Sequence, residues 1–176
     1  YINYEDARKF ENEVRHDVMA HVKAFGKLAP SAKPIIHLGA TSCYVTDNAE
    51  IMIIDDALRM VEKKLVNVMD KLQKFARKYK ALPTLGFTHL QPAQLTTVGK
   101  RATLWLSDLA MDYRSLKDLQ NTVKLRGVKG TTGTQASFLD LFDGDGEKVK
   151  ELEKRVVAKL VYEKVYGVTG QPYPRK

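Results

Sequence analysis

The sequence has no long apolar run and almost no cysteine, and each shortage excludes a class of protein. No run of more than four apolar residues occurs in the 176, whereas a membrane-spanning helix needs roughly 20. No basic start followed by an apolar stretch suggests a signal peptide. The single cysteine, Cys43, cannot form a disulfide within the chain and suits a reducing compartment such as the cytosol. The 44% hydrophobic and 28% charged residues are typical of a globular protein.

The net charge of +8 is gathered mainly in the middle of the chain. In residues 59–80 the basic side chains are interleaved with apolar ones at helical spacing. They are Arg59, Lys63, Lys64, Lys71, Lys74, Arg77, Lys78 and Lys80. We interpret them as the solvated face of a helix. A nucleic-acid surface is the less favoured alternative, because no aromatic stacking platform or recognised binding module accompanies them.

Residues 46–80 carry the clearest structural pattern, an apolar heptad stripe. One row is Ile51, Leu58, Leu65, Leu72 and Tyr79, and a second is Ile54, Val61, Val68 and Phe75. Asp47 and Glu50 have the spacing of a capping box and predict the start of the helix. A helix of about 33 residues would be about 50 Å long. Such a rod needs helical partners to cover its apolar stripe.

A second long helix is predicted from Pro92, a favoured first-turn residue, to about Lys124. Shorter helices are predicted over residues 4–25, ending at Gly26, and over residues 146–166, ending at Gly167. The connections contain proline and glycine and cover residues 26–42, 81–91, 126–134 and 167–176. No strand alternation is evident. The sequence therefore predicts an all-α fold built on long, nearly antiparallel helices.

Two of the four histidines are candidates for proton transfer, because imidazole exchanges protons most easily near neutral pH. His16 lies between Arg15, which could hold an anion, and Asp17, which could orient the ring. His89 lies in a predicted tight connection just before the helix expected at Pro92. A helix N-terminus favours anions and lowers the pKa of a nearby histidine. A purely structural role for His89 is the alternative.

The other two histidines are less suited to chemistry. His21 follows His16 by five residues, so the two rings do not share a helix face as metal ligands would. His37 stands among Ile35, Ile36 and Leu38, and we expect a core residue with its hydrogen bonds satisfied.

Two glycine-containing segments have the composition of anion-binding loops. Residues 39–42 read Gly-Ala-Thr-Ser, and residues 127–135 combine three glycines with three threonines and Lys129. Glycine lets backbone N–H groups approach a ligand closely, and hydroxyls add donors. Neither has the spacing of a P-loop. An ordinary helix connection is the alternative for each.

Four segments become informative when they are taken together and in order. They are Arg-His-Asp-Val-Met-Ala-His-Val at 15–22, Ile-Ile-His-Leu-Gly-Ala-Thr-Ser at 35–42, Leu-Gly-Phe-Thr-His-Leu-Gln-Pro-Ala-Gln at 85–94 and Lys-Gly-Thr-Thr-Gly-Thr-Gln at 129–135. They closely resemble the adenylosuccinate lyase family in its animal-type form, within the fumarase/aspartase superfamily. The resemblance extends through the closing segment 170–176.

The resemblance implies a fold, an assembly and a reaction. The family fold is a central bundle of very long helices in a homotetramer whose active sites are shared between subunits. Residues 1–41 would end the N-terminal helical domain, and residues 42–176 would begin the bundle. The family eliminates fumarate from adenylosuccinate, giving AMP, and from SAICAR, giving AICAR, in purine nucleotide biosynthesis. Neither a metal nor an organic cofactor is required, and no nucleic acid or membrane partner is implied.

The resemblance also implies roles for single residues. His89 matches the general acid that protonates the departing nitrogen, and His16 matches the histidine that supports this acid. The residues that match substrate contacts are Arg15, His16, Asp17, Thr41, Ser42, Thr88 and Gln171. The hydroxyl pair at 41–42 would hydrogen-bond the succinyl carboxylates.

The departures from the family pattern are equally informative. The signature loop, Gly-Ser-Ser leading to Met-Pro-x-Lys-x-Asn-Pro, does not occur in the 176 residues. In the family it supplies the serine base and a lysine for the carboxylates. Family chains are more than twice this length, so we expect an internal fragment that is inactive alone. The alternatives are another lyase of the superfamily, such as argininosuccinate lyase or fumarase, and a non-catalytic helical scaffold.

Overall fold

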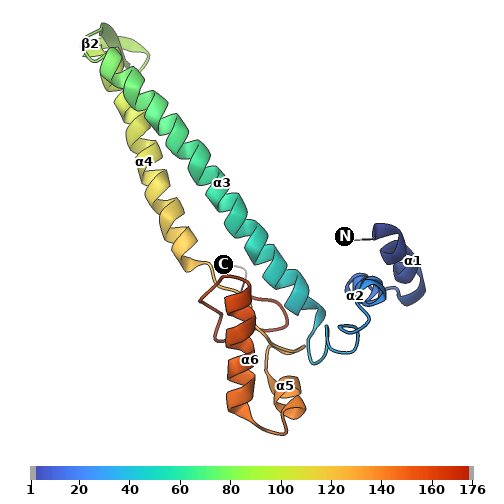
Figure 1. Ribbon diagram of the computed structural model, residues 1–176. Coiled ribbons are helices and arrows are strands. Elements are labelled where there is room, and N and C mark those ends of the chain that lie inside the picture. The colour runs from blue at the N-terminus through green and yellow to red at the C-terminus, as the bar shows by residue number, and fades with distance from the viewer. Residues whose placement is uncertain (1–2, 175–176) are drawn as a thin grey trace. The chain divides into compact units, whose positions relative to one another are not determined.

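The computed structural model describes residues 3–174, and Arg175 and Lys176 of the closing segment lie outside this range. The chain divides into two compact units. One contains the residues up to Met52 together with those from Lys124 onward, and the other contains Ile53–Val123. Helices dominate both units (Figure 1), which confirms the helical fold class. The predicted domain boundary between residues 41 and 42 stays a prediction.

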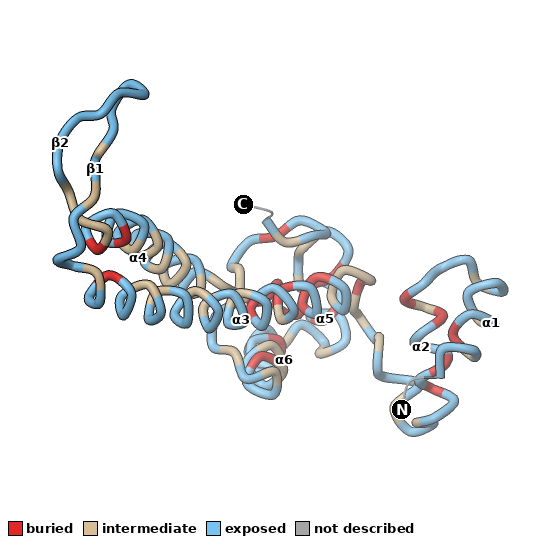
Figure 2. Tube along the Cα trace, turned by 90° about the horizontal axis from the view of Figure 1, so that it is seen from above, coloured by how far each residue is buried: buried red, intermediate tan, exposed pale blue. Residues whose placement is uncertain are grey.

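The second unit is built on two long antiparallel helices. Helix α3 (Ser42–Lys78) enters this unit at Ile53, and α4 (Val98–Thr122) runs back beside it (Figures 1 and 2). The heptad prediction of a rod over residues 46–80 is confirmed, although the helix begins four residues earlier. The predicted capping box is therefore wrong, because Asp47 lies inside α3. Its carboxylate instead accepts a hydrogen bond from the backbone N–H of Tyr173 at 2.7 Å.

A β-hairpin joins the two rods and corrects two predictions. Strands β1 (Pro83–Thr88) and β2 (Gln91–Thr97) pair antiparallel, so the expectation of no strands is wrong. Pro92 lies in β2, opposite Phe87, and the second rod begins at Val98 rather than at Pro92. A proline is tolerated here because both strands of a two-stranded sheet are edge strands.

Beside the hairpin the backbone of α4 at Gly99 lies close to the backbone at Ala76 and Lys80. Ala76, Gly99 and Ala102 are buried there, whereas most of the remaining surface of the two helices is exposed (Figure 2). Farther along, Glu62 of α3 accepts hydrogen bonds from three side chains of α4. They are Gln120 at 2.9 Å, Lys117 at 3.1 Å and Tyr113 at 3.4 Å. One carboxylate therefore ties the two helices together.

The first unit opens with two short helices in place of the single predicted helix over residues 4–25. They are α1 (Tyr4–Val14) and α2 (Asp17–Leu28). Arg15 ends α1 in a left-handed conformation with φ 54°, and its N–H bonds the carbonyl of Glu11. The next residue, His16, is extended and caps α2. Helical periodicity continues through this break, so the sequence pattern does not reveal it.

The rest of the first unit forms a small core around two further helices. Helix α5 (Ala136–Leu141) was not predicted, and α6 (Gly146–Lys159) ends earlier than the predicted residue 166. Val128, Phe138 and Val149 form the buried centre. The partly buried residues packed on it are Ala40, Tyr44, Phe142, Leu152 and Val156. This core joins the start of α3 to the glycine-rich loop that precedes α5.

Candidate active site

His16 connects the start of α2 to the start of α3. Its Nδ1 accepts the backbone N–H of Met19 at 3.3 Å, as a helix cap does. An accepting Nδ1 carries no proton, so the neutral ring holds its proton on Nε2. Nε2 lies 3.2 Å from Oγ of Ser42. In the neutral ring His16 therefore donates to the serine hydroxyl.

Asp17 gives His16 a second possible state. Its Oδ1 lies 3.5 Å from Nδ1 of the ring, and 44% of the histidine side chain is exposed. Protonation of Nδ1 would end the cap bond to Met19 and allow an ion pair with this carboxylate. In either arrangement Nε2 faces Ser42.

The structure brings the predicted triplet and the predicted hydroxyl pair together. Thr41 is buried at the entry to α3, and Ser42, the first residue of that helix, is half-buried. The hydrogen bond between His16 and Ser42 spans 26 residues of sequence. Arg15 and Asp17, on either side of His16, are exposed. A cation, an imidazole and two hydroxyl groups thus lie along one short stretch of the first unit.

His37 corrects a prediction, because it is not a satisfied core residue. The side chain is half-buried, and its Nδ1 is shielded from solvent without a hydrogen-bond partner among the described residues. Partial burial lowers its pKa, and the nearby His16 lowers the pKa further. The apolar neighbours in the sequence hid this feature.

His89 occupies the tip of the hairpin. It is exposed, and it and Leu90 form the two-residue turn with φ of 51° and 62°. The predicted tight connection is confirmed. The predicted helix N-terminus is not beside it, because α4 begins at Val98. Turns of this kind favour Asn-Gly, so His-Leu places two side chains in a backbone conformation that costs energy.

A cleft of about 840 Å³ lies between the hairpin and the start of α4. Thr88, the last residue of β1, is one of its lining residues, and Lys100 and Arg101 add positive charge. The guanidinium of Arg101 also donates to the carbonyl of Leu85 at 3.1 Å. The lining therefore suits an anionic ligand. The second unit thus carries Thr88 and His89, and the first carries the other predicted site residues.

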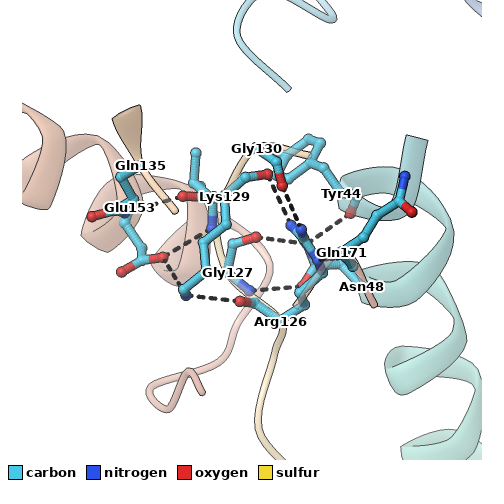
Figure 3. A network of polar contacts seen from close by, with 10 residues as sticks. Tyr44, Asn48, Arg126, Gly127, Lys129, Gly130, Gln135, Glu153 and Gln171 are labelled. Carbon is cyan, nitrogen blue, oxygen red and sulfur yellow. Dashed lines mark hydrogen bonds and ion pairs between the residues drawn. The ribbon is translucent and has the colours of Figure 1, made fainter. Parts of the chain in front are cut away.

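The glycine-rich loop uses its polar groups internally (Figure 3). Lys129 is buried, where its ammonium donates to the carbonyl of Arg126 at 2.9 Å and pairs with Glu153 at 3.2 Å. Glu153 also accepts the N–H of Val128 at 2.9 Å. The ammonium of Lys129 is therefore not available to bind an anion. This part of the loop is a structural connection, which was the alternative interpretation. Three threonine side chains of the loop remain exposed, Thr131, Thr132 and Thr134.

Gln171 has an exposed side chain and an anchored backbone. Its carbonyl accepts Nε–H of Arg126 at 2.8 Å. The sequence analysis gave Arg126 no role, yet it is fully buried. Burial of a guanidinium is unusual and lowers its pKa, while Asp47 and Cys43 act in the opposite direction.

Between residues 3 and 174, no group of three or more His, Cys, Asp or Glu side chains could hold a metal ion. None of the helices in that range combines the length and the apolar character that crossing a bilayer would take.

Comparison with known proteins gives consistent matches. A family described as lyase matches residues 6–161. Adenylosuccinate lyase of Saccharomyces cerevisiae is 61% identical over 93% of the chain, and that of Schizosaccharomyces pombe is 56% identical over 98%. The chain spans about a third of these relatives, 34% and 36% of their lengths.

A solved structure extends the likeness to the fold. The fumarate lyase of Mesorhizobium sp. BNC1 has a TM-score of 0.82 and 26% identity, with 95% of this chain and 38% of that one covered. The fold of this chain is thus similar to that of a known lyase over nearly its whole length. The family match covers most of the chain, and the chain belongs to this lyase family.

Proposed function

We propose that the protein to which this chain contributes eliminates fumarate from adenylosuccinate, giving AMP, and from SAICAR, giving AICAR. The observation that carries this proposal is the high identity to two yeast adenylosuccinate lyases over nearly the whole chain. The neighbourhood of His16, Thr41 and Ser42 supports it. Hydroxyl groups and a cation suit a substrate with two carboxylates. We also propose a cytoplasmic location, in keeping with the free Cys43.

His89 acts as the general acid in this proposal. Elimination leaves negative charge on the departing nitrogen, which must receive a proton. An imidazole at the tip of a hairpin can reach a substrate because it is exposed, and Thr88 beside it would help to hold that substrate. His16 supports the acid from the start of α2. The contacts to substrate come from Arg15, His16, Asp17, Thr41, Ser42 and Gln171.

A homotetramer with shared active sites completes the proposal. Several large apolar side chains of both long helices are exposed, among them Ile53, Met60, Leu104 and Trp105. Exposed apolar side chains at helical spacing on a long helix would be covered where other helices pack on it. The base and the lysine of the signature loop would come from parts of the protein beyond these 176 residues. The chain alone should therefore not turn over adenylosuccinate.

The test measures fumarate and AMP released from adenylosuccinate by the full-length protein. His89→Ala should lower kcat by about 10²–10⁴, the usual contribution of a general acid. His21→Ala, an exposed histidine on α2, is the matched control and should leave kcat unchanged. Full activity of the His89→Ala protein would contradict the assigned acid. Cleavage of argininosuccinate in place of adenylosuccinate would contradict the assigned substrate.

The isolated chain provides a second test. It should release no fumarate from adenylosuccinate, because the signature loop is not part of it. Turnover by the isolated chain that His89→Ala abolishes would refute this expectation.

A further inference from the structure

The backbone around Gln171 is held on both sides. On one side, Nε–H of Arg126 donates to the carbonyl of Gln171 at 2.8 Å. On the other, the carboxylate of Asp47 accepts the N–H of Tyr173 at 2.7 Å, and Glu50 accepts the phenol of Tyr173 at 3.2 Å. The side chain of Gln171 itself is exposed. An exposed side chain on a fixed backbone suits a residue that binds a ligand in a defined position.

Arg126 joins this segment to the glycine-rich loop. Its remaining guanidinium nitrogens donate to the carbonyls of Lys129 and Gly130, each at 2.9 Å (Figure 3). Three hydrogen bonds of this fully buried side chain therefore end on backbone carbonyls. Because the guanidinium is planar and rigid, three bonds of this kind fix the segments relative to one another.

The first turns of α3 hold the same assembly. Asp47 binds Tyr173, and Asn48 exchanges two hydrogen bonds with the backbone of Gly127, each at 3.2 Å. Asp47 follows Ser42 by five residues, a separation of about 7.5 Å along the helix axis. The hydroxyl pair at 41–42 and the segment of Gln171 are thus both attached to the N-terminal end of α3.

We propose that Arg126 and Asp47 are positioning residues that fix Gln171 relative to Thr41 and Ser42. Arg126 is fully buried, so it acts through the backbone of Gln171 and not by touching substrate. This inference rests on the proposed function, since it assumes that Gln171 contacts the substrate. Its consequence is that Asp47 and Arg126 control KM through Gln171 alone.

A double-mutant cycle in the full-length enzyme tests this coupling. Gln171→Ala should raise KM for adenylosuccinate about tenfold. Asp47→Ala, which removes the acceptor for the N–H of Tyr173, should raise KM about fivefold with kcat within twofold. The protein with both changes should have the KM of Gln171→Ala alone. Asp47→Asn keeps an acceptor oxygen and should restore KM to within twofold of the unchanged enzyme.

Controls make each outcome decisive. Arg155→Lys, at an exposed ion pair on α6, should leave KM unchanged. If Asp47→Ala does not fold, Arg126→Lys runs the same cycle, because it keeps the buried charge and loses the forked bonds. Increases in KM that multiply would overturn the positioning role. An unchanged KM in Gln171→Ala would overturn both this inference and the assigned contact. Failure of the unchanged enzyme to cleave adenylosuccinate would instead refute the proposed function.

Discussion

Gly99→Ala sets two opposing effects on stability against each other where α4 lies close to the end of α3. Gly99 is the second residue of α4, and its N–H donates to the carbonyl of Tyr79 at 2.9 Å. A Cβ at this position would lie 2.5 Å from the carbonyl oxygen of Ala76, and 2.6 and 2.7 Å from Cα and N of Lys80. All three atoms belong to the backbone, so no side chain can rotate away.

The magnitudes decide the sign of the change in stability. Alanine is favoured over glycine inside a helix by up to about 1 kcal/mol. Overpacking costs about 1–3 kcal/mol, and three backbone contacts below 3.0 Å place this site at the upper end. The net loss should be about 2 kcal/mol of the free energy of unfolding. With an m-value near 2 kcal/mol per molar urea, the midpoint of unfolding should fall by about 1 M.

Trp105 provides the assay for this prediction. It is the only tryptophan in the sequence and lies on α4, in the same unit as Gly99, so its fluorescence in urea follows the unfolding of that unit. Gly146→Ala is the control, because a Cβ there meets nothing within 4 Å at the start of α6. Its midpoint, followed by circular dichroism, should stay level or rise. An unchanged or raised midpoint for Gly99→Ala would refute the reasoning about the helix contact.

Three further expectations follow from packing and charge. Phe138→Ala removes the central ring of the first unit's core and should cost about 3 kcal/mol, measured by urea unfolding; a loss below 1 kcal/mol would contradict the assigned core. The hydrogen bonds of Gln120, and then those of Lys117, lower the pKa of Glu62, so its stabilisation is present above its usual pKa and lost as pH falls through the lowered one. Glu62→Gln should therefore lower the urea midpoint more at pH 7 than at pH 3, and an equal loss at both pH values would exclude an ionic tie between the helices. The exposed apolar residues of α3 and α4 should make the isolated chain self-associate, and a compact monomer in sedimentation velocity would count against helix packing between copies.

The long helices are the part of the fold that the local sequence pattern predicts best. A heptad stripe repeats the same information in every turn, so the end of α3 at Lys78 was predicted to within two residues. The hairpin lacks such repetition. Its strands contain Pro83, Gly86 and Pro92, which are residues typical of connections. A register irregularity between Leu85 and Phe87 further interrupts the alternation that would have indicated strands.

The resemblance named the candidate site residues but not the groups that support them. The resemblance pointed to His16 and Ser42, and the structure places them 3.2 Å apart. Arg126 escaped notice because a charged side chain is ordinarily exposed. Its partners are carbonyls three, four and 45 residues away, and backbone carbonyls leave no mark in a sequence. Only folding can bring such partners together.

Strained backbone conformations occur at two features that the sequence did not predict, and both carry residues of the proposed site. Arg15, His89 and Leu90 all have positive φ without being glycine, and each such residue costs roughly 1–2 kcal/mol. Glycine would remove that cost, but it would also remove the guanidinium and the imidazole that the proposed reaction uses. The break between α1 and α2 and the turn of the hairpin therefore hold side chains of the proposed site where local preference alone would place a glycine or an unbroken helix. Sequence patterns describe local preference, so they fail at the positions where the surrounding structure overrides it.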